Sequence, residues 1–341
     1  MSVNLKQLSA RLKLSPTTVS RALNGYSDVS EATRQLVTVA AREAGYAPNL
    51  VARRLAMGRA EAIGIVYPVE TDLMGNPLFL EMMRGASDRL DEAGFDVLVA
   101  VAHEGSELRT YERIIKGRRV DGVIVAHTLV NDERVNYLKK AGLPFVAYGR
   151  TGECDDFAWF DFDNEAGAAL AVQELANRGH RRIAYVHAPL NYNFAHQRRA
   201  GFVRGMKAAR IKPEPDYERL GGLDRRGGYA AGLALMALGK PPTAIIVDNS
   251  LCGVGVVRAL VHAGVSIGSD VSVVVHDGIP SDTLLIGQEI AAIDQPTARE
   301  SGATMAGMLL TLIDRKPLRQ RHVLRQPRFV LGRSVGPAPA N

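Results

Sequence analysis

The chain has 341 residues, of which 46% are hydrophobic and 23% are charged, a balance typical of a water-soluble protein with two or three domains. The net charge of +6 lies entirely in residues 1–60, where nine Lys or Arg accompany three Asp or Glu. A basic segment on a neutral body is typical of a nucleic-acid-binding domain, and a solubilising basic patch is the alternative. No apolar run reaches the roughly 18 residues of a membrane span and no signal peptide opens the chain, so we expect a cytoplasmic protein without a membrane partner.

The first predicted helix runs from Leu5 to about Leu12. Asn4 precedes it as an N-cap, and Leu5, Leu8 and Leu12 form one apolar stripe. Only Lys13-Leu14 separates this helix from the next one, so the two helices form a predicted helix-turn-helix.

The second predicted helix runs from Pro16 to about Leu23, with Ser15 as its N-cap and Asn24-Gly25 as its end. One face is apolar, because Val19 and Ala22 precede Leu23 at helical spacing. The opposite face carries short or cationic hydrogen-bonding side chains, namely Thr17, Thr18, Ser20 and Arg21. Such a helix suits the major groove of DNA, and the alternative is an ordinary capped surface helix.

A third helix is predicted from Glu31 to Ala44, with Ser30 as its cap and Gly45 at its end. Its apolar side is predicted to contain Leu36, Val37, Val39, Ala40 and Ala44. Residues 46–48 form an extended linker, because the residue before a proline avoids the helical region. Residues 49–58 then form a short basic helix that needs DNA or a second copy to be ordered.

From Ala62 onward, apolar runs typical of buried strands alternate with amphipathic stretches of helical length. We predict strands at Ala62–Tyr67, Phe95–Ala102, Gly122–Ala126, Phe145–Tyr148, Arg182–His187, Ala244–Val247 and Val271–Val275. This alternation predicts two doubly wound units of parallel sheet, which bind ligands beyond the carboxyl ends of their strands. The chain is expected to leave the first unit near Phe160–Asn164 and to return near Ala291–Gln295.

The sequence contains no common motif for metal binding, nucleotide binding or nucleophilic catalysis. Cys154 and Cys252 lie far apart without metal-ligand spacing, so we expect reduced thiols, no metal and no cofactor. There is no Walker loop, nucleophile elbow or metal-spaced His pair, and Gly253-Val-Gly255 lacks the third glycine of a dinucleotide fingerprint. We therefore expect no catalytic residues; an α/β enzyme and a sugar-binding protein for transport are the alternatives. The tail, residues 337–341, is expected to be disordered.

A series of motifs follows one order along almost the whole chain. In the N-terminal segment they are Asn4-Leu-Lys-Gln-Leu, Leu14-Ser-Pro-Thr-Thr-Val-Ser-Arg-Ala-Leu-Asn24, Val29-Ser-Glu-Ala-Thr-Arg34, Gly45-Tyr-Ala-Pro-Asn49 and Ala52-Arg-Arg-Leu55. In the body they are Ile63-Gly-Ile-Val, Asn76-Pro-Leu-Phe79, Asp121-Gly-Val-Ile, Asp163-Asn-Glu-Ala-Gly, Gly179-His-Arg-Arg-Ile, Arg198-Arg-Ala-Gly-Phe, His276-Asp-Gly and Ile293-Asp-Gln-Pro. In these motifs the chain resembles the LacI/GalR family of transcription regulators.

The resemblance implies an all-α helix-turn-helix headpiece at residues 1–46, a linker and hinge helix at 47–59, and an α/β core at 60–336. The core is expected to be like the periplasmic binding proteins, with two doubly wound parallel-sheet subdomains. The N-subdomain would comprise residues 60–161 and 291–323, and the C-subdomain 162–290 and 324–336. Family members bind near-palindromic operator DNA as dimers and respond to a small ligand, often a sugar. The family's tetramer-forming C-terminal leucine heptads are absent, so we expect a homodimeric repressor.

The resemblance places Pro16, Thr17 and Arg21 where family members read bases. Arg21 can bond guanine bidentately, worth about 1–3 kcal/mol of discrimination, whereas Pro16 offers only apolar contact. Leu55 matches the leucine that wedges into the central base step from the minor groove, and core packing is the alternative. The other predicted DNA contacts are Ser15, Thr18, Ser20, Asn24, Asn49, Ala52 and Arg53.

A sugar site needs an aromatic face and paired hydrogen-bonding groups. On the resemblance, the predicted ligand residues are Asn76, Phe79, Arg150, Arg198, Asn249, Asp277 and Gln295. Many relatives carry Asp-Arg where this chain has Gly149-Arg150, so one hydroxyl acceptor is missing. Structural roles are the alternative for each residue, such as turn formation by Asn76 or ion pairing by Arg150. Further stacking candidates are Trp159, Phe160, Tyr192 and Phe194.

The predicted mechanism is thermodynamic linkage between the core and the headpieces. A ligand would change how the two core subdomains sit, and so how the dimer holds its hinge helices. An effector can shift DNA affinity only by its different affinity for the two arrangements. The sequence leaves open whether the ligand induces or corepresses, and which sugar it is, although the headpiece loosely resembles regulators of α-glucoside use.

Overall fold

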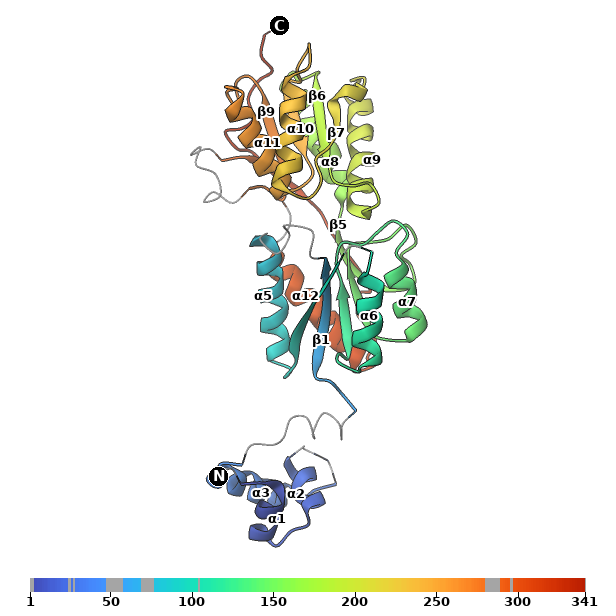
Figure 1. The fold of residues 1–341 in the computed structure, drawn as a ribbon, viewed down its shortest axis with the longest axis vertical. Coiled ribbons are helices and arrows are strands. Elements are labelled where there is room, and N and C mark those ends of the chain that lie inside the picture. The colour runs from blue at the N-terminus through green and yellow to red at the C-terminus, as the bar shows by residue number, and fades with distance from the viewer. Residues whose placement is uncertain are drawn as a thin grey trace. The chain divides into compact units, whose positions relative to one another are not determined.

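The computed structural model describes residues 3–23, 26, 28–46, 58–68, 77–103, 105–279, 289–294 and 297–340. The chain divides into two compact units, Met1–Glu61 and Ala62–Asn341 (Figure 1). In its described part the first unit is helical, whereas the second contains two sheets with helices on their faces. Each unit has a hydrophobic core of its own.

The described part of the N-terminal unit has three short helices: α1 (Leu5–Leu12), α2 (Pro16–Leu23) and α3 (Glu31–Glu43). The side chains of Asn4, Ser15 and Ser30 each accept a hydrogen bond from the backbone N–H three residues on, at 2.9, 3.0 and 3.3 Å. Each cap satisfies an N–H that has no partner within its helix. The predicted caps and the predicted helix-turn-helix are confirmed.

The core of this headpiece confirms one predicted face and corrects another. Leu8 and Val19 are fully buried, as their helical stripes predict. On α3 the buried residues are Val37, Ala40 and Ala41, whereas Leu36 and Val39 are exposed. The prediction for Leu36 and Val39 was wrong because a buried stripe follows i, i+3, i+4 spacing from Val37, and these two residues lie off that stripe.

The first sheet of the core has the strand order β11-β5-β4-β3-β1-β2, with all pairs parallel. Its strands are β1 (Ala62–Pro68), β2 (Asp96–Ala102), β3 (Gly122–Val125), β4 (Phe145–Tyr148), β5 (Ala158–Phe162) and β11 (His322–Arg325). One face packs against α5 (Pro77–Asp91) and α12 (Ala298–Ile313), and the other against α6 (Glu107–Lys116) and α7 (Glu133–Ala141). Burial on both faces explains the continuous Val and Ile runs of the inner strands.

The second sheet has the order β12-β10-β9-β8-β6-β7, with only the β10–β12 pair antiparallel. Its strands are β6 (Ile183–His187), β7 (Glu218–Leu220), β8 (Ala244–Val247), β9 (Ser272–His276), β10 (Ala291–Asp294) and β12 (Arg328–Val330). One face packs against α8 (Asn164–Asn177) and α9 (Asn193–Ala208), and the other against α10 (Arg225–Met236) and α11 (Ser250–His262). A short 3-10 helix, η2 (Pro215–Tyr217), precedes β7. The seven predicted strands and the two-sheet fold are therefore confirmed.

The chain crosses between the two sheets after β5, after β10 and between β11 and β12 (Figure 1). The return to the first sheet follows β10, within the expected range Ala291–Gln295. The expected subdomain bound at residue 291 is a few residues early, because Ala291–Ile293 still pairs with β9 in the second sheet. The bound at residue 324 is also early, because Leu324 and Arg325 still pair with β5 in the first sheet.

The C-terminal tail is anchored as far as the structure describes it. The backbone N–H of Ala338 donates to the carbonyl of Arg178 at 2.9 Å, and the carbonyl of Gly336 lies 3.1 Å from Nε2 of the buried His180. The predicted disorder of residues 337–341 was wrong for residues 337–340, because hydrogen bonds to Arg178 and His180, between α8 and β6, hold the tail. Asn341 lies outside the described residues.

Helices α5 and α12 cross at closest approach through two glycines. A Cβ on Gly85 would lie 1.8 Å from the carbonyl oxygen of Arg299, and one on Gly302 would lie 1.9 Å from that of Met82. Both distances are far below van der Waals contact, and backbone cannot give way as a flexible side chain can. The packing of the first sheet's helical layer therefore requires glycine at this crossing.

Replacing Gly302 by alanine should lower the free energy of unfolding by about 2 kcal/mol or more, because overpacking a close-packed site forces backbone shifts. Gly307 on the same helix is the matched control, since its nearest neighbour is Nε of Arg89 at 3.8 Å. Gly307→Ala should be neutral or stabilise by up to about 1 kcal/mol through helix propensity. Urea unfolding of both variants measures the difference, and equal stability of the two would contradict the crossing geometry.

Candidate functional site

The headpiece presents its polar residues on the outside of α2. Ser15, Pro16, Thr17 and Arg21 are exposed, whereas Thr18 and Ser20 are half-buried. The hydroxyls of Ser15 and Thr18 lie 2.8 Å apart and complete the cap. Five predicted DNA contacts lie outside the described residues, namely Asn24, Asn49, Ala52, Arg53 and Leu55.

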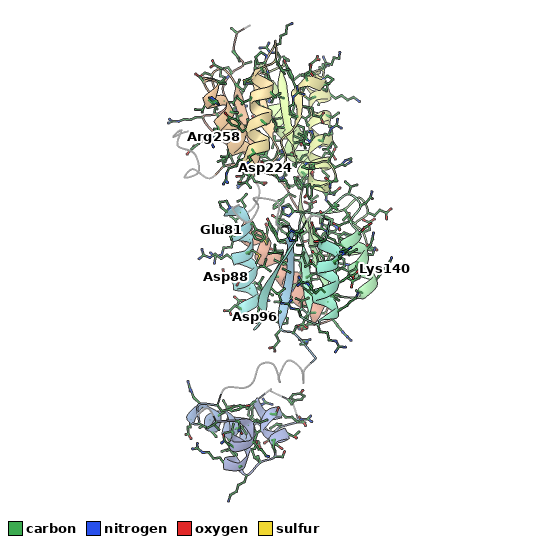
Figure 2. The ribbon with its side chains drawn as sticks, viewed as in Figure 1. Glu81, Asp88, Asp96, Lys140, Asp224 and Arg258 are labelled. Carbon is green, nitrogen blue, oxygen red and sulfur yellow. The ribbon has the colours of Figure 1, made fainter. Side chains whose placement is uncertain are left out.

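The second site is a cavity of about 830 Å³ in the core unit, with walls from both sheets and their helices. It lies at the carboxyl ends of the parallel strands, where the sequence predicts it. Four predicted ligand residues line it: Phe79, Arg198, Asn249 and Asp277. Glu81, labelled on α5 in Figure 2, also lines this cavity. Two others, Asn76 and Gln295, lie outside the described residues.

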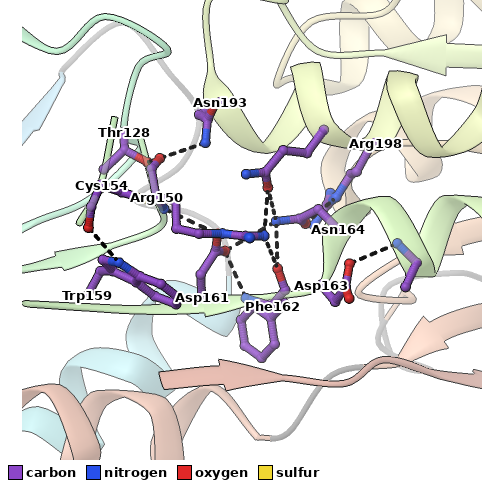
Figure 3. A network of polar contacts seen from close by, with 12 residues as sticks. Thr128, Arg150, Cys154, Trp159, Asp161, Phe162, Asp163, Asn164, Asn193 and Arg198 are labelled. Atoms are coloured by element: carbon purple, nitrogen blue, oxygen red, sulfur yellow. Dashed lines mark hydrogen bonds and ion pairs between the residues drawn. The ribbon is translucent and has the colours of Figure 1, made fainter. Parts of the chain in front are cut away.

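Arg198 on α9 is the buried cation of the cavity (Figure 3). Its Nε donates to Oδ1 of Asn164 at 2.9 Å, and a terminal nitrogen donates to the backbone carbonyl of Asp248. The other terminal nitrogen lies 3.7 Å from Oδ2 of Asp277. A guanidinium with five fixed donors can hold these groups and still offer a hydrogen bond to a ligand hydroxyl.

Asp277 supplies the facing carboxylate. It follows β9 in a left-handed conformation with φ of 66°, held by a bond from its backbone N–H to the carbonyl of Ile293 at 3.0 Å. Its side chain keeps a quarter of its surface exposed. Burial raises the pKa of this carboxyl while the nearby Arg198 lowers it. Arg198 and Asp277 together form the donor and acceptor pair that a polyol requires.

Asn249 lines the cavity and also has a structural role. Its side-chain oxygen accepts from the backbone N–H of Cys252 at 2.9 Å, which caps α11, and its amide nitrogen donates to the carbonyl of Gly222 at 3.0 Å. One donor and one acceptor position of the amide stay available to a ligand.

The prediction for Arg150 needs correction, because Arg150 does not line the cavity. Its Nε donates to Oδ2 of Asp161 at 2.8 Å, and one terminal nitrogen reaches the carbonyl of Phe162 and the amide oxygen of Gln197 (Figure 3). The preceding Gly149 has a φ of 109°, and a Cβ there would lie 2.5 Å from Oγ1 of Thr128. The backbone therefore leaves no room for an acceptor side chain at residue 149. The side chain of Arg150 instead binds Asp161 on the neighbouring strand, β5.

Sequence reasoning found two aromatic residues of the cavity, Phe79 and Phe194, but missed Tyr67 and His127. Tyr67 at the end of β1 lies 4.1 Å, centroid to centroid, from Phe79, and 5.6 Å from His127. Burial lowers the pKa of His127 to about 4, so its ring is neutral at physiological pH. The signal was present, since Tyr67 and His127 stand at or just beyond strand ends. Other lining residues that the sequence analysis did not select are Tyr148, Asp161, Phe162, Asn164 and Asp294.

The four further stacking candidates divide between cavity and core. Phe194 lines the cavity, and the guanidinium of Arg198 lies 5.0 Å from its ring centroid. Tyr192 stacks on Phe194 at 5.8 Å without lining the cavity. Trp159 stacks on His322 and Phe160 is in the core of the first sheet, so neither reaches the site.

Backbone bonds clasp the two halves of the core beside the cavity. The N–H of Val130 donates to the carbonyl of Asn191 at 2.9 Å, and the N–H of Asn193 donates to the carbonyl of Thr128 at 2.9 Å. The side chain of Asn193 also donates to the carbonyl of Arg150 at 2.8 Å (Figure 3). We call the contact between residues 128–130 and 191–193 the clasp. It lies at the start of α9, the helix that carries Arg198.

Among the described residues of the chain, no group of His, Cys, Asp and Glu side chains could hold a metal ion. Among the same residues, no helix is long and apolar enough to span a bilayer.

A helix-turn-helix unit joined to a two-sheet α/β unit with a cavity between its sheets defines a class of DNA-binding transcriptional regulators. Two family models match the chain. Residues 9–49 match the bacterial regulatory proteins of the lacI family, and residues 60–332 match the periplasmic binding proteins and sugar binding domain of the LacI family. The chain belongs to the LacI family.

Individual relatives agree with this assignment. The transcriptional regulator RafR of Escherichia coli is 39% identical over 334 residues, which cover 98% of each chain. The lac repressor dimer, solved with operator and an anti-inducer, is 26% identical with a TM-score of 0.83 and full coverage of both chains. The regulator CelR, solved in complex with cellobiose, is 26% identical with a TM-score of 0.74, covering 97% of this chain and 99% of that one.

Removing the guanidinium of Arg198 should cost about 3 kcal/mol of stability, because it leaves buried groups that it pairs without a partner. Arg204 on the same helix is the matched control, since its ion pair with Glu165 is exposed. Arg204→Ala should cost less than about 1 kcal/mol. Chemical denaturation of Arg198→Met and Arg204→Ala measures both values, and a similar cost for the two would show that Arg198 is not the anchor of the site.

Proposed function

We propose that the protein is a repressor that binds a near-palindromic operator as a homodimer and is controlled by a sugar in the core cavity. One observation carries the proposal: a basic helix-turn-helix unit shares its chain with a cavity whose walls come from two subdomains. In this proposal residues 1–46 are the headpiece, 47–59 the linker and hinge helix, and 60–336 the core. The predicted DNA and ligand residues keep these roles as proposals, except Arg150.

The lining of the cavity supports a sugar as the ligand. Sugars present apolar faces of C–H groups beside rows of hydroxyls, which suit aromatic rings beside paired donors and acceptors. Tyr67, Phe79 and Phe194 supply rings, and Arg198 with Asp277 supplies the polar pair. The relative CelR was solved with cellobiose, which supports the same class of ligand here.

An apolar edge of the first sheet supports the homodimer. β2 is the outermost strand of this sheet, and its Val99 and Val101 are exposed, as is Leu80 on α5. An exposed strand edge with apolar side chains promotes pairing with another chain unless it is covered. In a two-fold dimer the same patch of a second copy covers it. The lac repressor structure is a dimer on operator, which supports this assembly.

The proposal excludes catalysis. The relatives reported above are regulators, and the buried Arg198 is held by a hydrogen bond to Asn164 and an ion pair with Asp277. A bacterial regulator of transcription acts where the chromosome is, so we place the protein in the cytoplasm.

Leu55→Ala should weaken operator binding by about tenfold or more, because a wedge side chain stabilises the kinked base step that lets DNA wrap the protein. Leu50→Ala, in the same predicted helix, is the control and should change binding less. Gel-shift titration measures both affinities, and a melting curve checks that the fold is intact. An unchanged operator affinity for Leu55→Ala would remove the wedge role.

The whole proposal is tested by identifying both ligands in turn. Selection from a duplex library with a randomised core gives the preferred operator, and thermal-shift screening against sugars, polyols and nucleosides gives the effector. The effector should change the affinity of the full chain for the operator. A chain lacking residues 1–58 should still bind the effector but should no longer bind DNA. Enrichment of no duplex sequence, or an effector that binds without changing DNA affinity, would contradict it.

A further inference from the structure

The exposed arginine of α2 is held along one edge by a single carboxylate. Nε of Arg21 donates to Oδ1 of Asp28 at 3.2 Å, and one terminal nitrogen lies 2.7 Å from Oδ2 of the same residue. This bidentate arrangement uses the side edge of the guanidinium, which is formed by Nε and the terminal nitrogen NH2. Because both bonds converge on one carboxylate, the plane and direction of the guanidinium are fixed together.

The residues that hold Arg21 are themselves anchored to the headpiece. The backbone N–H of Tyr26 donates to the carbonyl of Arg21 at 3.1 Å, which ties Tyr26 to the last turn of α2. Arg34 on α3 donates to the carbonyl of Tyr26 at 3.1 Å and to that of Val29 at 3.4 Å. Val29 is buried in the headpiece core. The backbone of Asp28 is therefore restrained by the adjacent Val29, which is buried and hydrogen-bonded to Arg34.

An aromatic ring supports the same guanidinium. The centre of the Arg21 guanidinium lies 4.9 Å from the ring centroid of Tyr26, within the range of a cation–π contact. The guanidinium is thus restrained by two separate groups, the ring of Tyr26 and the carboxylate of Asp28. Together they reduce the entropy that Arg21 would lose on binding a base.

The end edge of the guanidinium, formed by its two terminal nitrogens NH1 and NH2, is not the edge that Asp28 binds. Among the residues that the structure describes, the second terminal nitrogen, NH1, has no hydrogen-bond partner. NH1 and the remaining hydrogen of NH2 form a second pair of parallel donors. A guanine presents two acceptors, N7 and O6, side by side in the major groove and matches such a pair.

We propose that Asp28 is a positioning residue for base recognition, which holds Arg21 by its side edge and leaves the end edge directed at a guanine. The inference rests on the proposed function, in which Arg21 reads a base. It adds a second role for the carboxylate: its negative charge opposes contact of Arg21 with DNA phosphates. Asp28 therefore favours the correct sequence over random duplex, because random binding depends on phosphate contacts.

A second ion pair of the headpiece shows what an ordinary surface contact looks like. Arg11 and Glu43 meet through one atom pair at 3.7 Å, and both side chains are exposed. Exposed pairs of this kind contribute little to stability, so removal of either acid should leave the fold intact. Glu43→Gln therefore matches Asp28→Asn in its change of charge and in its exposure, without touching Arg21.

The test uses the full-length protein and a duplex library with a randomised core. The wild-type chain selects a preferred duplex, and its affinity for that duplex is divided by its affinity for random duplex. Arg21→Ala should lower this ratio by tenfold or more and erase one guanine preference. Asp28→Asn should lower it by about fivefold at the same base position, partly through tighter random binding. Glu43→Gln should change both affinities equally and keep the ratio.

A double variant separates positioning from a general charge effect. In the Arg21→Ala background, Asp28→Asn should leave the ratio unchanged, because the carboxylate acts through the guanidinium. A ratio that stays at the wild-type value in Asp28→Asn, or falls as far in Glu43→Gln, would overturn the inference and leave the proposed function standing. Failure of the wild-type chain to enrich any sequence would overturn the proposed function itself.

Discussion

The core depends on one buried charge, the guanidinium of Arg198. It joins the start of α8 at Asn164, the end of β8 at Asp248 and the end of β9 at Asp277. A charge removed from water is tolerated only when hydrogen bonds and a counter-charge satisfy it, so these three elements must end at one place. Arg198 therefore fixes one wall of the cavity, because Asn164 and Asp277, which it contacts, also line it.

Local rules predicted much of the fold and part of the site. Caps at Asn4, Ser15 and Ser30 follow from side-chain chemistry within one turn. The strand-end rule together with the family resemblance predicted Phe79, Arg198, Asn249 and Asp277, which line one cavity. Such rules fail where distant contacts decide. The edge strands β7, β11 and β12 are too short and too exposed to carry an apolar pattern, so neighbouring strands define them.

Arg150 shows the same limit inside the site. Its sequence position, directly after β4, is as favourable as that of Asp277 after β9. The direction of its side chain depends on the positive φ of Gly149 and on a buried carboxylate eleven residues later, Asp161. Neither the positive φ of Gly149 nor the contact with Asp161 can be predicted from the spacing of residues in the sequence. The tail shows this too, because a Pro- and Ala-rich segment looks disordered until the carbonyl of Arg178 is found beside it.

One helix connects the ligand site to the contact between the subdomains. α9 carries Arg198 in the cavity and begins with Asn193, which binds the carbonyls of Thr128 and Arg150 across the clasp. A packed helix moves as a rigid body, so a ligand that draws Arg198 changes the strain on those bonds. Under the proposed function, a ligand that prefers one setting of the clasp by about 1–3 kcal/mol can change DNA affinity by at most the same free energy.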